Sequence, residues 1–154
     1  MAGYGFNGQI PGTLIDFYSI QEGLALISNK MGIIIATPDT NLIQLGDLEY
    51  KSRKLHDPDN PNSISAYMLG SLIEDNVRGN HVLWIGTYQG LNKFDKKTEK
   101  FAHYKHDPGD PQSLCNDRIT RVFKDKTGII WIGTQGGGLS KFDPRQQKFE
   151  YFKQ

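Results

Sequence analysis

The sequence predicts an all-β protein, and an internal repeat is the main reason. The tetrapeptide Trp-Ile-Gly-Thr occurs at residues 84–87 and again at residues 131–134, with similar residues around both copies. A repeat of about 40–50 residues is typical of propellers and solenoids. No stretch of helical length places apolar residues at helical spacing. We therefore expect β-propeller blades, each made of four antiparallel strands. The chain is expected to have about three such blades, so the ring is incomplete unless the chain oligomerises.

Each clear copy of the repeat supplies four short apolar stretches, which we expect to form the four strands of one blade. The earlier copy has them at residues 72–75, 82–87, 90–95 and 101–104, and the later copy has them at residues 119–125, 128–134, 138–143 and 149–152. Trp84 follows Asp75 by nine residues, whereas Trp131 follows Asp125 by six. We expect such insertions to be confined to turns, with the strands kept in step.

A weaker copy of the repeat precedes the two clear ones. Residues 13–20 are rich in β-branched and aromatic side chains, which favours a strand before this copy. Its four strands are then expected at residues 24–29, 32–37, 41–45 and 49–55, without a tryptophan. The whole chain, residues 1–154, is thus expected to be one propeller segment with blades at about 14–55, 56–105 and 106–154.

The second strand of each clear copy is apolar on both faces, which is typical of a strand that is covered on both sides. We expect Trp84 and Trp131 to fill the gap between blades, with a sugar-stacking platform as the less favoured alternative. Gly86 and Gly133 are expected to remove side-chain bulk where another backbone comes close.

The loop at residues 56–65 begins His-Asp-Pro, and it recurs at residues 106–115. Its cluster of His, Asp and Asn side chains suggests a metal site. However, the two prolines of each loop fix an extended turn, and the spacing of a calcium-binding loop is absent. We therefore expect no metal and no cofactor, and instead a structural lock of Asx turns in which Ser63 and Ser113 bond local backbone.

Composition excludes several classes of function. The formal charge of +1 argues against non-specific binding of nucleic acid. Cys115 is the only cysteine, and we expect a buried structural thiol. No stretch reaches the roughly 20 apolar residues of a membrane span. Residues 1–8 lack the basic region and apolar core of a signal peptide, so we expect either a cytosolic protein or a piece of an exported parent.

Taken together, the His-Asp-Pro loop, the Gly-x-x-Trp-Ile-Gly-Thr strand and the following Gly-Leu-x-x-Phe-Asp strand resemble the two-component regulator propeller repeat family. Residues 56–154 carry nearly two full units, and residues 24–55 match weakly. The resemblance implies the sensor region of a hybrid two-component system: seven-bladed propellers outside the inner membrane, followed by a membrane helix and a histidine kinase. In gut bacteria many such sensors detect oligosaccharides. This chain departs from the pattern because it has no second propeller, membrane helix or kinase.

In a blade of this topology, the loop before the first strand and the turn after the second strand lie at the same end. That end is expected to surround the mouth of the channel and to bind a ligand. It carries aromatic, amide and charged side chains that suit a hydroxyl-rich ligand: Tyr67, Tyr88, Gln89, Asn116, Asp117, Arg118 and Gln135. The simpler alternative for any one of them is structural, with Asn116 and Asp117 capping turns and Gln135 exposed to solvent.

The sequence thus favours a sensory, ligand-binding module without catalytic residues, located in the periplasm if it belongs to a sensor. The ligand would be a small polar molecule such as an oligosaccharide. One alternative is a structural or protein-interaction fragment that self-associates, since two copies of three blades would give a ring of about six. A third reading is a propeller lyase or glycosidase, but no catalytic motif supports it.

Overall fold

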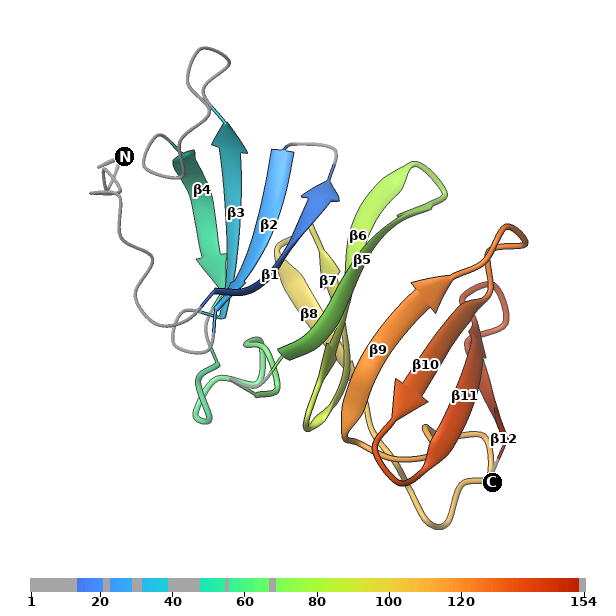
Figure 1. The fold of residues 1–154 in the computed structure, drawn as a ribbon. Helices are drawn as coiled ribbons and strands as arrows, with labels where there is room; N and C mark the ends of the chain where they lie inside the picture. Colours follow the sequence, from blue (N-terminus) through green and yellow to red (C-terminus); the bar gives the residue numbers. More distant parts are fainter. Residues whose placement is uncertain are drawn as a thin grey trace. The chain divides into compact units, whose positions relative to one another are not determined.

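The computed structural model describes residues 14–20, 23–28, 32–38, 48–54, 56–66 and 69–152, and its regular elements in these ranges are all β-strands (Figure 1). The strands form three antiparallel sheets of four consecutive strands each. The chain divides into two compact units, residues 1–55 and residues 56–154, called unit 1 and unit 2. The prediction of an all-β fold built from four-stranded blades is confirmed.

Unit 1 contains one sheet with the order β1-β2-β3-β4. Its strands are β1 (Leu14–Ile20), β2 (Gly23–Ser28), β3 (Gly32–Pro38) and β4 (Leu48–Lys54).

The strand assignment predicted for this sheet was wrong by one position. Residues 14–20 form its first strand, so residues 32–38 take the third position and not the second. The expected strand at 41–45 lies outside the described residues. The weak copy lacks the Trp-Ile-Gly-Thr sequence, so nothing in it fixes the alignment, whereas the close pairing of Ile20 with Gly23 makes β1 and β2 a hairpin.

Unit 2 contains two sheets with the same topology. The first has the strands β5 (Leu69–Val77), β6 (Asn80–Thr87), β7 (Gly90–Asp95) and β8 (Lys100–Tyr104). The second has β9 (Ile119–Lys124), β10 (Ile130–Thr134), β11 (Gly138–Asp143) and β12 (Lys148–Phe152). In Figure 1, β5 and β9 lie next to each other where the two sheets meet.

The register of the strands confirms that the two tryptophans are equivalent. Trp84 pairs with Ile73 on β5 and with Lys93 on β7. Trp131 pairs with Phe123 on β9 and with Lys141 on β11. Residues paired across a sheet share one face, so each tryptophan defines a face, called the Trp face of its sheet.

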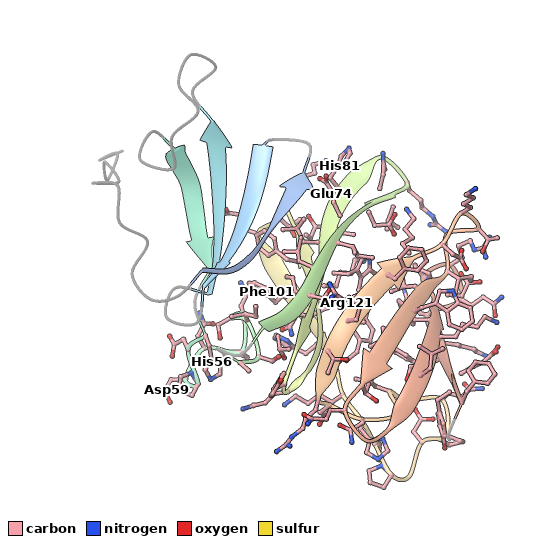
Figure 2. The ribbon with its side chains drawn as sticks, in the orientation of Figure 1. His56, Asp59, Glu74, His81, Phe101 and Arg121 are labelled. Atoms are coloured by element: carbon pink, nitrogen blue, oxygen red, sulfur yellow. The ribbon has the colours of Figure 1, made fainter. Side chains whose placement is uncertain are left out.

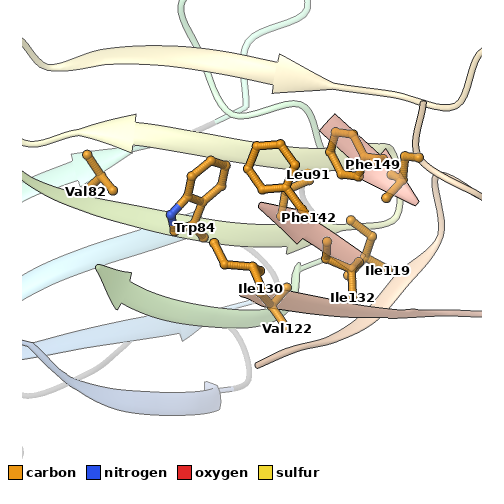
Figure 3. Packing of buried hydrophobic residues seen from close by; sticks show 10 residues of the cluster. Val82, Trp84, Leu91, Ile119, Val122, Ile130, Ile132, Phe142 and Phe149 are labelled. Carbon is orange, nitrogen blue, oxygen red and sulfur yellow. The ribbon is translucent and has the colours of Figure 1, made fainter. Parts of the chain in front are cut away.

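The core of unit 2 lies between the Trp face of the β5–β8 sheet and the opposite face of the β9–β12 sheet (Figure 3). The Trp84 ring lies 5.2 Å from the ring of Phe142 and 5.8 Å from that of Tyr104, at angles typical of aromatic packing. Val82 and Leu91 of the first sheet meet Ile130 and other apolar residues of the second. Blade-to-blade packing of the second strand is therefore observed for β6.

The Trp face of the β9–β12 sheet is different, because no described residue covers it. Leu139 is 39% exposed, whereas its counterpart Leu91 is fully buried. Phe123 and Phe152 on the same face are 60% and 53% exposed. Trp131 is only half-buried, and its ring lies 6.3 Å from that of Phe152. The expected coverage of both faces thus holds for β6 but not for β10.

The two strand glycines also differ in their surroundings. A Cβ atom on Gly86 would overlap Cγ2 of Ile119 and lie 3.0 Å from Cγ2 of Val122. The close neighbour of Gly86 is therefore a pair of side chains from the next sheet, and the expectation of a close backbone was wrong. A Cβ atom on Gly133 would have its nearest neighbour 3.6 Å away, at Oγ1 of Thr120. The expectation fails there as well, because none of the described sheets lies against that face.

The extra residues of the first hairpin lengthen the strands, which corrects the expectation that insertions stay in turns. β5 and β6 continue their pairing as far as Val77 and Asn80. Arg78 and Gly79 then close a two-residue turn with φ of 55° and 81°, the left-handed conformation that such hairpin turns require. In the other sheet, the chain turns directly after Lys124.

Candidate functional site

The two His-Asp-Pro loops have the same internal hydrogen bonds. In the first loop, Oγ of Ser63 accepts from the amide of Asp57 at 3.0 Å and donates to its carbonyl at 2.8 Å. In the second, Ser113 makes the same pair of bonds with Asp107 at 2.9 and 3.0 Å. The carboxylates of Asp57 and Asp107 each accept a hydrogen bond from the amide two residues later, which is an Asx turn.

The histidines of these loops also have matching structural roles. Nδ1 of His56 lies 2.7 Å from the carbonyl oxygen of Ile64, and Nδ1 of His106 lies 2.7 Å from that of Leu114. The predicted structural lock is therefore confirmed. Within the part of the chain that the structure describes, no group of three or more His, Cys, Asp or Glu residues is placed to hold a metal ion.

The loops before the first strands and the turns after the second strands meet at one end of unit 2, here called the loop end (residues 56–66, 87–90, 105–118 and 134–138). The amide of Gly90 donates to the carbonyl of Asp117 at 2.9 Å, and this bond links the two sheets. The amide of Gln135 donates to the carbonyl of Arg118 at 2.8 Å. Figure 2 shows His56 and Asp59 at this end, with the labelled Glu74 and His81 at the other end of β5 and β6.

The structure places six of the seven candidate ligand-binding residues at the loop end, while Tyr67 lies outside the described residues. Gln89, Arg118 and Gln135 are exposed, and Tyr88, Asn116 and Asp117 are half-buried.

Two of these six residues have structural hydrogen bonds. Oδ1 of Asn116 accepts from the amide of Arg118 at 2.8 Å, and Oδ1 of Asp117 accepts from the amide of His106 at 2.7 Å. Asn116 and Asp117 therefore stabilise the loop, as the simpler alternative supposed. No side-chain hydrogen bond is seen for the exposed Gln89, Arg118 and Gln135 within the described residues.

A cavity of about 790 Å³ lies at the loop end, and its wall runs onto the Trp face of the β9–β12 sheet. Asn116, Thr134 and Gly136 line it, and Asn116 alone comes from the candidate set. Cys115 also lines it, with its sulfur 3.4 Å from Oγ1 of Thr134. The thiol is buried, as predicted for a structural cysteine.

A second cleft, of about 340 Å³, lies at the opposite end of unit 2, here called the hairpin end (residues 77–80, 95–100, 125–129 and 143–148). It opens between the two sheets, and sequence reasoning missed it. Residues from both sheets line it: Asp75, Asn76, Val77, Arg78, Trp84, Lys93, Tyr104, Lys124, Thr127, Gly128, Phe142, Pro144, Arg145 and Gln147. The sequence feature that could have indicated this cleft is the longer first hairpin, because residues 76–78 of that hairpin form part of the wall.

Several ionisable groups near the hairpin end have shifted pKa values, and two of these groups lie beside the tryptophans. Hydrogen bonds from the Thr127 hydroxyl and from the Trp131 indole lower the pKa of Asp125 to about 2. Burial raises the pKa of Tyr104. The Asp125 carboxylate therefore stays ionised at any pH near neutrality.

Each sheet has four consecutive antiparallel strands, and in unit 2 one sheet packs face to face on the next over Trp84. This is the architecture of β-propeller blades. Residues 113–136 match the model of the family described as "Two component regulator propeller". Residues 113–136 thus match one copy of this propeller repeat. No helix in the described residues is long and apolar enough to cross a membrane.

Three known proteins show the extent of the similarity. The chain is 40% identical over 110 residues to "Histidine kinase P4" of Formosa agariphila, a match that covers 68% of this chain and 8% of that protein. The extracellular domain of the proposed hybrid two-component system BT3049 of B. thetaiotaomicron has a TM-score of 0.74 at 20% identity, over 96% of this chain and 19% of that one. The extracellular domain of BT4673 from the same organism has a TM-score of 0.51 at 17% identity, over 91% and 21%. The chain thus spans a small part of each relative.

Proposed function

We propose that this chain is the ligand-recognising part of a two-component-type sensor and that it binds a small polar ligand, such as an oligosaccharide, at the loop end of unit 2. The resemblance to parts of a histidine kinase and of extracellular sensor domains supports the sensory role. It also supports a location in the periplasm. We further propose that the three sheets, at about residues 14–55, 56–105 and 106–154, are successive blades of one propeller segment.

The hydrogen bond between Gly90 and Asp117 is the observation that carries the location of the site. It ties the turn of one blade to the loop of the next, so the exposed Gln89 and Arg118 stand on adjoining, mutually fixed loops. Amide and guanidinium groups donate and accept hydrogen bonds in the way that sugar hydroxyls require. A ligand that bridges these loops would change how tightly neighbouring blades are held together. This offers a route from binding to signal.

A thermal-shift screen with neutral oligosaccharides tests this proposal, because a ligand that binds only the folded state raises the melting temperature. We expect at least one oligosaccharide to raise the Tm of the wild type, and Arg118→Ala to reduce that shift. Arg121→Ala is the matched control, because Arg121 is an exposed arginine on strand β9, outside the loop end. The proposal fails if no oligosaccharide shifts the Tm, or if both variants respond like the wild type.

The exposed Trp face of the β9–β12 sheet favours a second candidate function, self-association. The equivalent face of the β5–β8 sheet is covered by a blade of the same repeat, so the surface fits another such blade. We propose that a second copy of this chain supplies it. Sedimentation velocity should show a dimer or larger species, and Leu139→Lys with Phe152→Lys should dissociate it, while Lys126→Ala, a change of an exposed turn residue, should not. A wild type that stays monomeric at high concentration contradicts this candidate.

Binding without catalysis is the reading that the matched repeat supports, since it is described as a two-component regulator propeller. Replacing Asp117, the carboxylate of the candidate binding set, by Asn would test the enzymatic alternative, in which a lyase or glycosidase needs such a group. We expect no turnover of oligosaccharides by the wild type. Measurable turnover that Asp117→Asn abolishes would establish an enzyme.

A further inference from the structure

The indole N–H of Trp84 has no acceptor among the described residues, although the side chain is only 1% exposed. A buried N–H without a partner loses the hydrogen bond that it would make in water, so such groups are rare in native structures. Trp84 lines the 340 Å³ cleft at the hairpin end. The side chain that carries this unused donor therefore lines a space large enough for a small molecule.

The equivalent residue in the next blade shows which acceptor this position takes. Nε1 of Trp131 donates to the Asp125 carboxylate at 2.8 Å. Asp75 is the counterpart of Asp125, but it lies inside the lengthened hairpin, paired with Val82. Its carboxylate forms an ion pair with Lys124 of the next sheet. Thus the carboxylate of Asp125 accepts the N–H of Trp131, whereas the corresponding carboxylate of Asp75 pairs with Lys124 and leaves the N–H of Trp84 without an acceptor in the described part of the chain.

The charges around the cleft favour an anion. Its wall contains four basic residues and one acidic residue. Two of the basic groups already have carboxylate partners, because Lys124 pairs with Asp75 and Arg145 with Asp143.

The other two basic groups are not neutralised by any described carboxylate. Nζ of Lys93 lies 5.7 Å from the centre of the Trp84 ring, on the wall of the cleft. Arg78 stands in the two-residue turn of the lengthened hairpin. A guanidinium and an ammonium group that line the same cleft as an unpaired N–H donor form a typical recognition set for a carboxylate, sulfate or phosphate group.

We propose that the cleft between the β5–β8 and β9–β12 sheets binds a small molecule through an oxyanion group, which accepts a hydrogen bond from Trp84 and is held by Lys93 and Arg78. The volume of about 340 Å³ suits a molecule of the size of one acidic sugar or a small organic acid. This site lies at the opposite end of unit 2 from the proposed oligosaccharide site and does not depend on it. Both sheets contribute to its wall, so an occupant would bridge two blades.

The test is a titration of the full chain carrying Trp131→Phe, in which Trp84 is the only tryptophan. Sodium glucuronate and sodium sulfate are the charged probes, glucose is the neutral match for glucuronate, and sodium chloride holds the ionic strength constant. We expect glucuronate or sulfate to change Trp84 fluorescence with saturation, and glucose to have no effect. Lys93→Gln and Arg78→Gln should each weaken binding by roughly tenfold or more, because each removes a charged hydrogen-bond donor.

Lys97→Gln is the matched control, because Lys97 is an exposed lysine that does not line the cleft, and it should leave the affinity unchanged. Trp84→Phe keeps an aromatic ring and removes the N–H, so calorimetry on that variant should also show weaker binding. If Trp84→Phe does not fold, the two charge variants still decide the question.

The absence of a saturable response to both anions overturns the inference, as does an equal response of the Lys93→Gln and Lys97→Gln variants. Equal binding of glucose and glucuronate, unaffected by Lys93→Gln, would also overturn it. That last result would leave the proposal of a sugar site at the loop end standing.

Discussion

Trp84 and Trp131 occupy the same register position in adjacent sheets, but their indole N–H groups differ in hydrogen bonding. Trp131 donates to Asp125, whereas Trp84 is enclosed against Phe142 and has no acceptor among the described residues. One cause is the next sheet, which covers Trp84. The other is the ion pair between Asp75 and Lys124, which occupies the carboxylate that corresponds to Asp125.

Gly86→Ala should destabilise the protein. The added Cβ would overlap the side chain of Ile119, and overfilling a packed core costs about 1–3 kcal/mol. Gly133→Ala is the matched control, because its Cβ would have 3.6 Å of clearance. Urea unfolding of both variants measures the difference. Equal effects of the two substitutions would mean that the two sheets do not pack as described.

Asp125→Asn should change how stability depends on pH. The pKa of Asp125 is about 2 in the folded protein, below the ordinary value of 3.8, because Thr127 and Trp131 donate hydrogen bonds to the ionised form. The carboxylate therefore contributes stability above about pH 4, and the contribution is lost as the pH falls toward 2. The free energy of unfolding of the wild type should exceed that of Asp125→Asn at pH 6, and the two should converge near pH 2.

Trp131→Phe serves as a control for this prediction. Loss of the indole donor should move the pKa of Asp125 upward, toward 3.8, and so narrow the pH range over which stability is lost. A difference between wild type and Asp125→Asn that stays constant from pH 6 to pH 2 would show that the carboxylate is not held by these donors.

Ser113→Ala should weaken the His-Asp-Pro loop. The buried hydroxyl accepts from the amide of Asp107 and donates to its carbonyl, and both groups would lose their partner. We expect a loss of about 1–3 kcal/mol in the free energy of unfolding, measured in urea. Gln112→Ala, at the exposed neighbouring position, should change it by less than about 0.5 kcal/mol. A Ser113→Ala variant as stable as Gln112→Ala would argue against the lock.

Much of the fold could be predicted from the sequence because the two clear repeats carry the same markers. The shared Trp-Ile-Gly-Thr strands predicted the four-stranded sheets of unit 2. The equivalent Ser63 and Ser113 predicted the hydrogen bonds that lock the loops. The weak repeat lacks those markers, so its strands were assigned one position out of step. Repetition alone also could not show that β10 would be half-exposed, because coverage depends on what lies against the sheet and not on the strand itself.

The candidate sites, too, could be predicted from the sequence only in part. The loop end could be located from topology, since the direction of each strand decides which loops meet. The hydrogen bonds of Asn116 and Asp117, and the cleft beside Trp84, depend on side-chain geometry that the repeat pattern does not contain. The ion pair of Asp75 with Lys124 joins side chains of two different sheets, which the repeat pattern does not specify.

Acrylamide quenching of the two single-tryptophan variants, Trp131→Phe and Trp84→Phe, in dilute solution tests the central claim most directly. The stacking of one blade on the next predicts that Trp84 emits at a shorter wavelength and is quenched several-fold less than Trp131. Equal emission and equal quenching of the two tryptophans would contradict the account.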